Sequence, residues 1–133
     1  MNKIKTFMML LLSVVPATAY TAEVNQLRIY ISNQSFAKPQ ENITLNVNGE
    51  VLYNRILPVK EQHHYEEFTV QRTNDMKQWI SVMANDTKAA ATLSIDTKDI
   101  NDDTWISVEY WYSEDRKIGY FSFVTGRGLF LID

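Results

Sequence analysis

The 133-residue sequence contains no cysteine, and it has only three prolines, four glycines and two histidines. Without cysteine there is no disulfide framework, no thiol nucleophile and no cysteine-ligated metal, so stability must come from packing alone. The sequence also has neither a Gly-x-Ser-x-Gly elbow nor a glycine-rich phosphate loop. These absences argue against hydrolytic and nucleotide-dependent catalysis. We predict that the protein is not an enzyme and uses no cofactor.

The two histidines form one dipeptide, His63-His64, followed closely by Glu66 and Glu67. On a strand, neighbouring side chains point to opposite faces, so His63 would share a face with Glu67 and His64 with Glu66. Two pairs on opposite faces do not make one tetrahedral metal site, which needs three or four ligands together. A weak surface site stays open only if residues 61–64 form a loop. We predict a charged entrance to a strand and no metal.

Clusters of basic residues are missing as well. The chain has 13 Lys and Arg against 16 Asp and Glu, which gives a formal net charge of −3. Proteins that bind nucleic acids neutralise phosphates with a basic patch or stripe, and no such stripe is present. Nucleic acid is therefore excluded as a partner.

The longest apolar run lies at the N-terminus. Two lysines within the first five residues precede an apolar stretch from Phe7 to Val15, and Ala17-Thr18-Ala19 supplies a small-x-small cleavage pattern. The run is too short to span a bilayer, which takes about 20 residues. A buried core helix is the alternative, but the basic start and the Ala-x-Ala end favour a secretory signal. We predict that residues 1–19 are a signal peptide, with export to the bacterial periplasm or the extracellular space and no stable membrane insertion afterwards.

Residues 20–133 would then form the mature protein. Cleavage removes two lysines and no acidic residue, so the formal net charge changes from −3 to −5. This length matches the commonest size of a single domain and can bury one hydrophobic core. We expect one acidic domain after the signal.

From Gln26 onward the hydrophobic pattern has a period of two. Leu27, Ile29 and Ile31 alternate with other residues, as expected for a half-buried strand. Asn48-Gly49 is typical of a tight hairpin turn, because both residues tolerate a positive φ. Further strands are expected near residues 43–47, 51–57, 65–71, 77–84, 89–96, 104–112, 118–125 and 129–132.

Seven to nine short strands with regularly spaced turns, and no clear helical pattern, are typical of an antiparallel β-sandwich. We predict an all-β, immunoglobulin-like sandwich, with a small closed barrel as the rival. Trp79 and Trp105 are the candidates for the tryptophan that such domains bury. The likeness concerns architecture only, because the cysteine pair of true immunoglobulin domains is missing.

The stretch EYWYSEDRKIGYF, which begins at Glu109, places aromatic residues on both sides of a charged turn. A four-residue loop at 113–116 sets Val108 opposite Phe121 and produces one coherent apolar face. A five-residue loop would instead mix apolar with polar residues and waste buried area at roughly 25 cal/mol per Å². We therefore predict the four-residue loop and a two-sided hairpin.

In that register the outward face is rich in aromatic rings, and we predict it to be the partner-binding surface. Exposed contiguous apolar area tends to mark contact sites, and Trp and Tyr are enriched at interaction hot spots. Two alternatives stay open: the rings could form simple cross-strand pairs, or a loop or the 129–132 strand could cover them. The predicted site consists of Trp105, Glu109, Trp111, Ile118 and Tyr120.

We therefore predict a non-catalytic module that recognises another protein, as an inhibitor, an immunity-type antagonist or a subunit of a surface assembly. Glu109, Glu114 and Asp115 near the aromatic face favour a basic partner through electrostatic steering. The alternative is a carbohydrate-binding module that stacks sugars on the same face. A third hypothesis is structural: the apolar segment 128–132 would pair with a sheet edge, in its own fold or in a neighbouring protein.

Overall fold

The computed structural model describes residues 26–59 and 65–130, which form eight β-strands and a short 3₁₀ turn at Thr97–Asp99. The predicted signal and the His63-His64 dipeptide lie outside the described residues. Among the described residues, no helix is long and apolar enough to cross a membrane. The strands are β1 (Gln26–Asn33), β2 (Gln40–Val47), β3 (Glu50–Pro58), β4 (Glu66–Gln71), β5 (Lys77–Ala84), β6 (Ala90–Asp96), β7 (Thr104–Ser113) and β8 (Ile118–Arg127).

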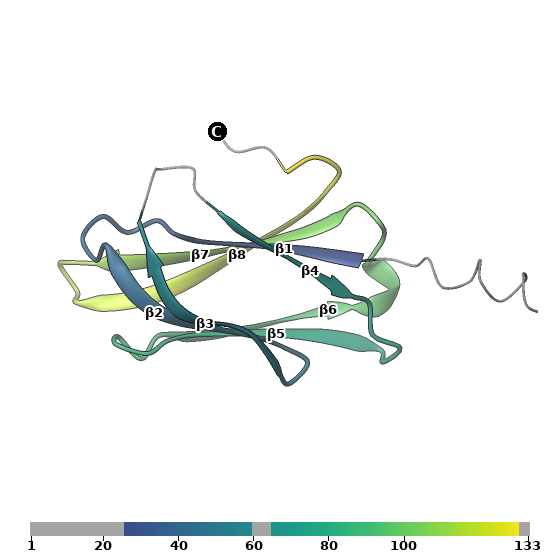
Figure 1. The fold of residues 1–133 in the computed structure, drawn as a ribbon, viewed down its shortest axis with the longest axis horizontal. Helices are drawn as coiled ribbons and strands as arrows, with labels where there is room; N and C mark the ends of the chain where they lie inside the picture. Colours follow the sequence, from purple (N-terminus) through teal and green to yellow (C-terminus); the bar gives the residue numbers. More distant parts are fainter. Residues whose placement is uncertain (1–25, 60–64, 131–133) are drawn as a thin grey trace, which may run out of the picture.

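These strands form two layers of four (Figure 1). The order is β4-β1-β7-β8 in the first layer, called sheet A, and β3-β2-β5-β6 in the second, called sheet B. All neighbouring strands run antiparallel except β1 and β7, which are parallel. The all-β, two-layer prediction is confirmed, whereas the expectation of purely antiparallel pairing is wrong at this one pair.

The alternating sequence pattern explains the layers, because each strand turns its apolar residues toward the other sheet. In β5, for example, Ile80 and Val82 are buried while Ser81 and Met83 face outward. Inward residues of both sheets meet in one hydrophobic cluster, which supplies the main favourable contribution to folding. Its fully buried members include Leu27, Ile29, Ile31, Ile43, Leu45, Leu57, Ile80, Ile106, Val108 and Tyr110.

The tight turn predicted at Asn48-Gly49 is present. Val47 pairs with Glu50, and the two intervening residues have φ angles of 51° and 87°. Two successive left-handed residues match the twist of the flanking strands, and asparagine and glycine adopt this conformation at low cost. The turn joins β2 to β3.

Neither candidate for a buried tryptophan belongs to the core. Trp79 is 49% exposed on sheet B, because it alternates with the buried Ile80 rather than sharing its face. Trp105 lies on the outer face of sheet A and is half-buried there. The buried aromatic residues of the core are tyrosines instead, Tyr110 of β7 and Tyr53 of β3, with 0% and 2% of their surface exposed.

The last predicted strand, at residues 129–132, is not formed over Leu129 and Phe130, and the remaining positions lie outside the described residues. Gly128 has a φ of +82°, a left-handed conformation that turns the chain after β8. The segment after β8 therefore leaves the sheet edge and lies over the outer side of sheet A (Figure 1).

Candidate functional site

The β7–β8 hairpin has the predicted four-residue loop length, but the loop comprises residues 114–117 instead of 113–116. Val108 consequently lies opposite Phe123, not Phe121. Because side chains alternate with a period of two, a shift of two residues changes the partners but keeps every side chain on its predicted face. The predicted sidedness is thus confirmed, and the predicted pairs are wrong. Lys117 closes the loop with a left-handed φ of 54°.

All five predicted site residues lie on the outer face of sheet A, although their exposure differs. Ile118 and Tyr120 are each 49% exposed. Trp105, Glu109 and Trp111 are half-buried. The face divides into two regions along the β7–β8 hairpin. We call the region around Trp105 and Phe130 the covered end, and the region formed by Trp111, Ile118 and Tyr120 the open end.

At the covered end, the ring of Phe130 contacts three other aromatic rings. It stacks on Tyr30, with centroids 4.0 Å apart and an interplanar angle of 14°. It also meets Tyr65 and Trp105 edge to face, with centroids 5.0 and 4.9 Å apart. Such aromatic pairs contribute about 0.5–1.5 kcal/mol each beyond the area that they bury. The cluster shields Trp105 from solvent.

Backbone contacts hold Phe130 in place. The Arg28 guanidinium donates hydrogen bonds to the carbonyl oxygens of Gly128 and Asp103, at 2.8 and 3.0 Å. The Gly128 N–H donates to the same Asp103 carbonyl at 2.9 Å. Charged donors make the stronger class of hydrogen bond. Arg28 thereby ties the chain that follows β8 to the outer face of sheet A.

A glycine lies beneath the Trp105 indole. Trp105 is paired with Gly126 across the hairpin, and a Cβ atom at position 126 would overlap Cζ2 of the indole. Any larger residue at position 126 would displace the ring. Glycine is therefore required here by close approach and not by its backbone angles.

Glu109 is engaged within the protein. The Tyr65 hydroxyl donates a hydrogen bond to Glu109 Oε1 at 3.0 Å. Burial, followed by this hydrogen bond and the negative charge of Glu109, raises the pKa of Tyr65. This hydrogen bond connects Glu109, in the middle of the face, to Tyr65 at the covered end. It occupies one carboxylate oxygen, so only part of the hydrogen-bonding capacity of Glu109 is free.

The open end presents apolar groups to solvent. Tyr120 lies opposite Trp111, whose indole Nε1–H donates a hydrogen bond to Ser122 Oγ at 3.2 Å. Ile118 and Val124 continue the exposed row along β8, and Val124 is also 49% exposed. The turn at 114–117 borders this row with two acidic and two basic residues, all exposed. The result is an apolar row with a charged rim.

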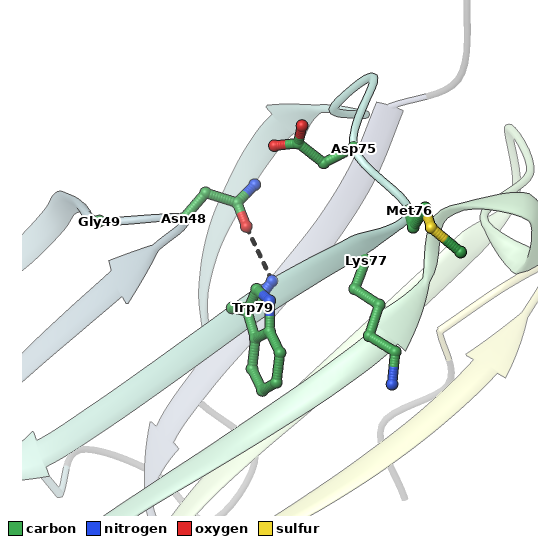
Figure 2. A pocket seen from close by; sticks show the side chains of 6 residues that line it. All are labelled: Asn48, Gly49, Asp75, Met76, Lys77 and Trp79. Carbon is green, nitrogen blue, oxygen red and sulfur yellow. Dashed lines mark hydrogen bonds between the residues drawn. The ribbon is translucent and has the colours of Figure 1, made fainter.

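Sheet B carries an exposed aromatic residue that the sequence analysis named as one of two candidates for the buried tryptophan. Trp79 borders an open pocket of about 620 Å³ (Figure 2). Asn48 Oδ1 accepts a hydrogen bond from the Trp79 backbone N–H at 2.8 Å, which fixes the β2–β3 turn against β5. Trp79 directly precedes the buried Ile80, so the alternation of side chains along β5 indicates that Trp79 faces outward. The lining residues are Asn48, Gly49, Asp75, Met76, Lys77 and Trp79.

A buried polar cluster closes one end of the core. The Glu41 carboxylate accepts hydrogen bonds from the Tyr110 hydroxyl at 3.2 Å and from the Asp86 backbone N–H at 2.9 Å, and Lys38 Nζ lies 3.5 Å away. The Tyr110 hydroxyl also lies 3.2 Å from Thr87 Oγ1. Burial raises the pKa of Tyr110 to about 12, and the charge of Glu41 adds to the rise. The cluster thus bridges β2 and β7 through a carboxylate whose two oxygens both accept hydrogen bonds.

The described part of the chain holds no group of three or more His, Asp or Glu side chains placed to bind a metal ion. The chain matches no protein-family model, and no curated protein or solved structure is significantly similar to it. On the strands of the described residues, exposed aromatic rings lie in two places, the open end of sheet A and the Trp79 pocket.

Proposed function

We propose that the protein is an exported, non-catalytic binding module with an immunoglobulin-like sandwich, and that it recognises another protein through the open end of sheet A. The observation that carries the proposal is the exposure of Ile118 and Tyr120, each 49%, beside the half-buried Trp111. The export pattern in residues 1–19 supports a role in the periplasm or outside the cell.

The open end has the composition and rigidity that protein recognition requires. Tyrosine and tryptophan are over-represented among residues that dominate binding energy, and a charged rim commonly surrounds them. The hydrogen bond from Trp111 to Ser122 orders the indole before any partner arrives. Pre-ordering lowers the entropy cost of binding, since a side chain that is already fixed loses little freedom. Trp105 and Glu109 contribute indirectly, by anchoring the strand that carries Trp111.

Charge favours a basic partner. The mature chain predicted from residue 20 has a formal net charge of −5, and Glu114 and Asp115 lie in the turn beside the open end. The turn itself is balanced by Arg116 and Lys117, so the preference comes mainly from the overall field of the protein. Such a field raises the rate of encounter with a positively charged surface and weakens as salt screens it.

The proposal is tested by comparing Tyr120→Ser with Met83→Ser. Met83 is 43% exposed on the outer face of sheet B and so provides a matched loss of exposed apolar surface. Both purified variants and the wild type are used as bait in extracts of the compartment in which the protein resides, and captured proteins are quantified. Tyr120→Ser should lower the affinity for the captured partner by at least about tenfold, the effect expected of a hot-spot residue.

The controls are thermal unfolding and direct titration. Tyr120→Ser should leave the melting temperature almost unchanged, because half of the side chain is already in water. Met83→Ser should bind the partner as the wild type does. A partner that binds wild type and Tyr120→Ser equally in calorimetry would contradict the proposal.

A second candidate function is carbohydrate binding, and the Trp79 pocket favours it. The indole is 49% exposed, and Asn48 and Asp75 line the same open pocket with amide and carboxylate groups (Figure 2). A flat apolar ring next to polar groups matches the alternating faces of a sugar. This candidate relocates sugar stacking away from Trp105, which Phe130 covers.

Glycan binding is tested on a glycan array with wild type, Trp79→Ala and Tyr120→Ala. The expected result is a signal that Trp79→Ala abolishes and Tyr120→Ala retains. Loss of the signal in Tyr120→Ala alone would return sugar binding to sheet A, and a wild-type signal no higher than background would eliminate this candidate function.

A further inference from the structure

The strand β8 differs in composition from the edge strands on the other side of the sandwich. Within the described residues, the edges of the two sheets are β4 and β8 in sheet A, and β3 and β6 in sheet B. From Ile118 to Gly126, β8 contains neither a charged residue nor proline. By contrast, β3 carries Glu50 and Arg55, and β4 carries Glu66 and Glu67.

These differences matter because an edge strand exposes unpaired backbone N–H and C=O groups to solvent. Natural proteins protect such edges with charged side chains, proline, bulges or short strands, since an unprotected edge is a template for another strand. The β3 and β4 edges follow this rule, and Arg55 and Glu66 form an ion pair of 3.9 Å between them. The β2–β3 pairing also contains a register shift next to Leu45.

The β6 edge is the closest comparison with β8. It too lacks charge from Ala90 to Ile95, but it has seven residues against ten. Its exposed side chains include Ala90 and Thr92, which are small, whereas β8 exposes Ile118, Tyr120 and Val124. Of the four edges in the described sheets, β8 is the one with a long uncharged run, Ile118 to Gly126, that exposes large apolar side chains.

We propose that β8 is a self-association edge, at which the β8 strands of two copies of this chain pair antiparallel and join their A sheets into one continuous sheet. This inference goes beyond the proposed function, because it concerns the backbone edge of β8 and a second copy of the protein. It does not depend on recognition of a different protein by the open end.

Self-pairing is favoured by the side chains that it brings together. An antiparallel pairing centred on Phe121 places Ile118 opposite Val124 of the second copy, so that apolar groups meet on the outer face. Tyr120 lies opposite Ser122 of the second copy in the same arrangement. The pairing places even-numbered residues opposite even-numbered ones and odd-numbered opposite odd-numbered. Outward side chains therefore stay outward, and inward side chains stay inward, in both copies.

Charges at the ends of β8 are complementary in this arrangement. The turn of one copy comes beside the C-terminal end of β8 in the other, which directs Asp115 toward Arg127 of the second copy at both ends of the interface. A parallel arrangement would instead place the two Arg127 side chains together. Opposite charges at facing positions stabilise strand pairs, whereas like charges destabilise them. The second copy is therefore bound antiparallel.

The association should be weak and reversible. One strand edge buries less surface than the roughly 1,200 Å² at the lower limit of stable protein interfaces, so the dissociation constant should lie near the micromolar range. In the dimer, the two open ends would lie on the same side of the joined sheet. A dimer would thus present the proposed partner-binding residues twice, which raises avidity for a partner that has two sites.

The test compares Val124→Lys with Val51→Lys by sedimentation equilibrium, over about two orders of magnitude in concentration around the micromolar level. Val51 lies on the β3 edge and is 55% exposed, against 49% for Val124, so the two substitutions are matched. Wild type and Val51→Lys should change from monomer to dimer as concentration rises. Val124→Lys should raise the dissociation constant at least tenfold, because each lysine would face the apolar Ile118 of the second copy, and a charged side chain on an edge strand disfavours the addition of another strand.

A charge exchange tests the orientation. Arg127→Asp should weaken the dimer, because two negative charges then face each other. The double variant with Asp115→Arg should restore it, because the two charges have then exchanged places and attract each other again. Circular dichroism and melting temperature show that each variant folds. A wild type that stays monomeric at every concentration would overturn the inference and leave the edge to a strand of a different protein. Equal weakening by Val51→Lys, or no recovery in the double variant, would overturn it as well.

Discussion

The covered end and the open end of sheet A are each centred on a tryptophan of β7 but have opposite surroundings. Each combines a β7 tryptophan with neighbouring aromatic and apolar residues: Trp105 at one end, Trp111 at the other. Trp105 is shielded by Phe130, while Trp111 borders the exposed Tyr120. The difference arises from residues outside the hairpin, because Phe130 and Arg28 reach only one end. Aromatic composition on a strand predicts a surface of interest, and chain segments packed over it decide whether a partner can reach it.

The two ends therefore have different roles in our proposal. The rings at the covered end pack against one another, so substitutions there should mainly change the free energy of unfolding. The side chains at the open end are in contact with water, so substitutions there should mainly change the affinity for a partner. Substitutions that alter one property at one end and leave the other unchanged would sharpen this division, and substitutions that alter both would break it.

The largest expected effect is that of Gly126→Ala at the covered end. The new Cβ would overlap the Trp105 ring, so the indole must leave its place and the contact with Phe130 is lost. Overpacking of this kind costs about 1–3 kcal/mol of unfolding free energy, and loss of the ring contact adds to it. Urea unfolding followed by circular dichroism measures the change.

A double-mutant cycle with Trp105→Ala separates the causes in this measurement. If the cost of Gly126→Ala comes from the clash with the indole, the same substitution should cost little once the ring is absent. An equal cost in both backgrounds would mean that the backbone of β8, and not the ring, requires glycine.

An effect that is no larger is expected at alkaline pH, where the buried Tyr110 and the half-buried Tyr65 respond. Burial raises the pKa of Tyr110 to about 12 from a usual value of 10, and the pKa of Tyr65 at the covered end is also raised. A raised folded-state pKa gives stability that is complete below pH 10 and is lost as the pH rises through the folded value. For Tyr110 this loss is about 2–3 kcal/mol. The free energy of unfolding should therefore fall as the pH is raised from about 9 to about 12, the range that spans these pKa values.

Two phenylalanine variants assign that loss. Tyr110→Phe should flatten most of the alkaline decline, although it lowers stability at neutral pH because the hydrogen bonds to Glu41 and Thr87 disappear. Tyr65→Phe should flatten a smaller part. A decline that is equally steep in Tyr110→Phe would show that other groups control alkaline unfolding.

Much of the fold could be predicted from the period of two in the sequence. Alternation located all eight strands of the described residues and assigned the correct face to Val108, Trp111 and Tyr120. Asn48-Gly49 located its turn because both residues accept positive φ angles. The loop of the β7–β8 hairpin was misplaced by one residue at each end, since Lys117 occupies a left-handed conformation that its residue type does not indicate.

The contacts that distinguish the two ends could not be predicted from local patterns. Tyr30 and Phe130 stack across 100 positions of sequence, and Arg28 binds the carbonyl of Gly128 across a similar span. Alternation assigns a face to each residue but does not indicate which distant segment will lie on that face. The exposure of Trp79 could have been predicted from the alternation, because Ile80 and Val82 are the buried residues of β5 and Trp79 has the opposite orientation.

The parallel pair β1–β7 has a consequence for how the molecule comes into being. Arg28 of β1 adjoins Trp105 of β7, so the middle of sheet A joins residues that are separated by more than half of the chain. Such long-range closure is slow, because the entropy of a large loop must be lost before its contacts form. During synthesis, sheet A cannot be completed until nearly all of the polypeptide has emerged. A chain that ends before β7 would leave β1 paired with β4 alone, with the backbone groups of its other edge unpaired.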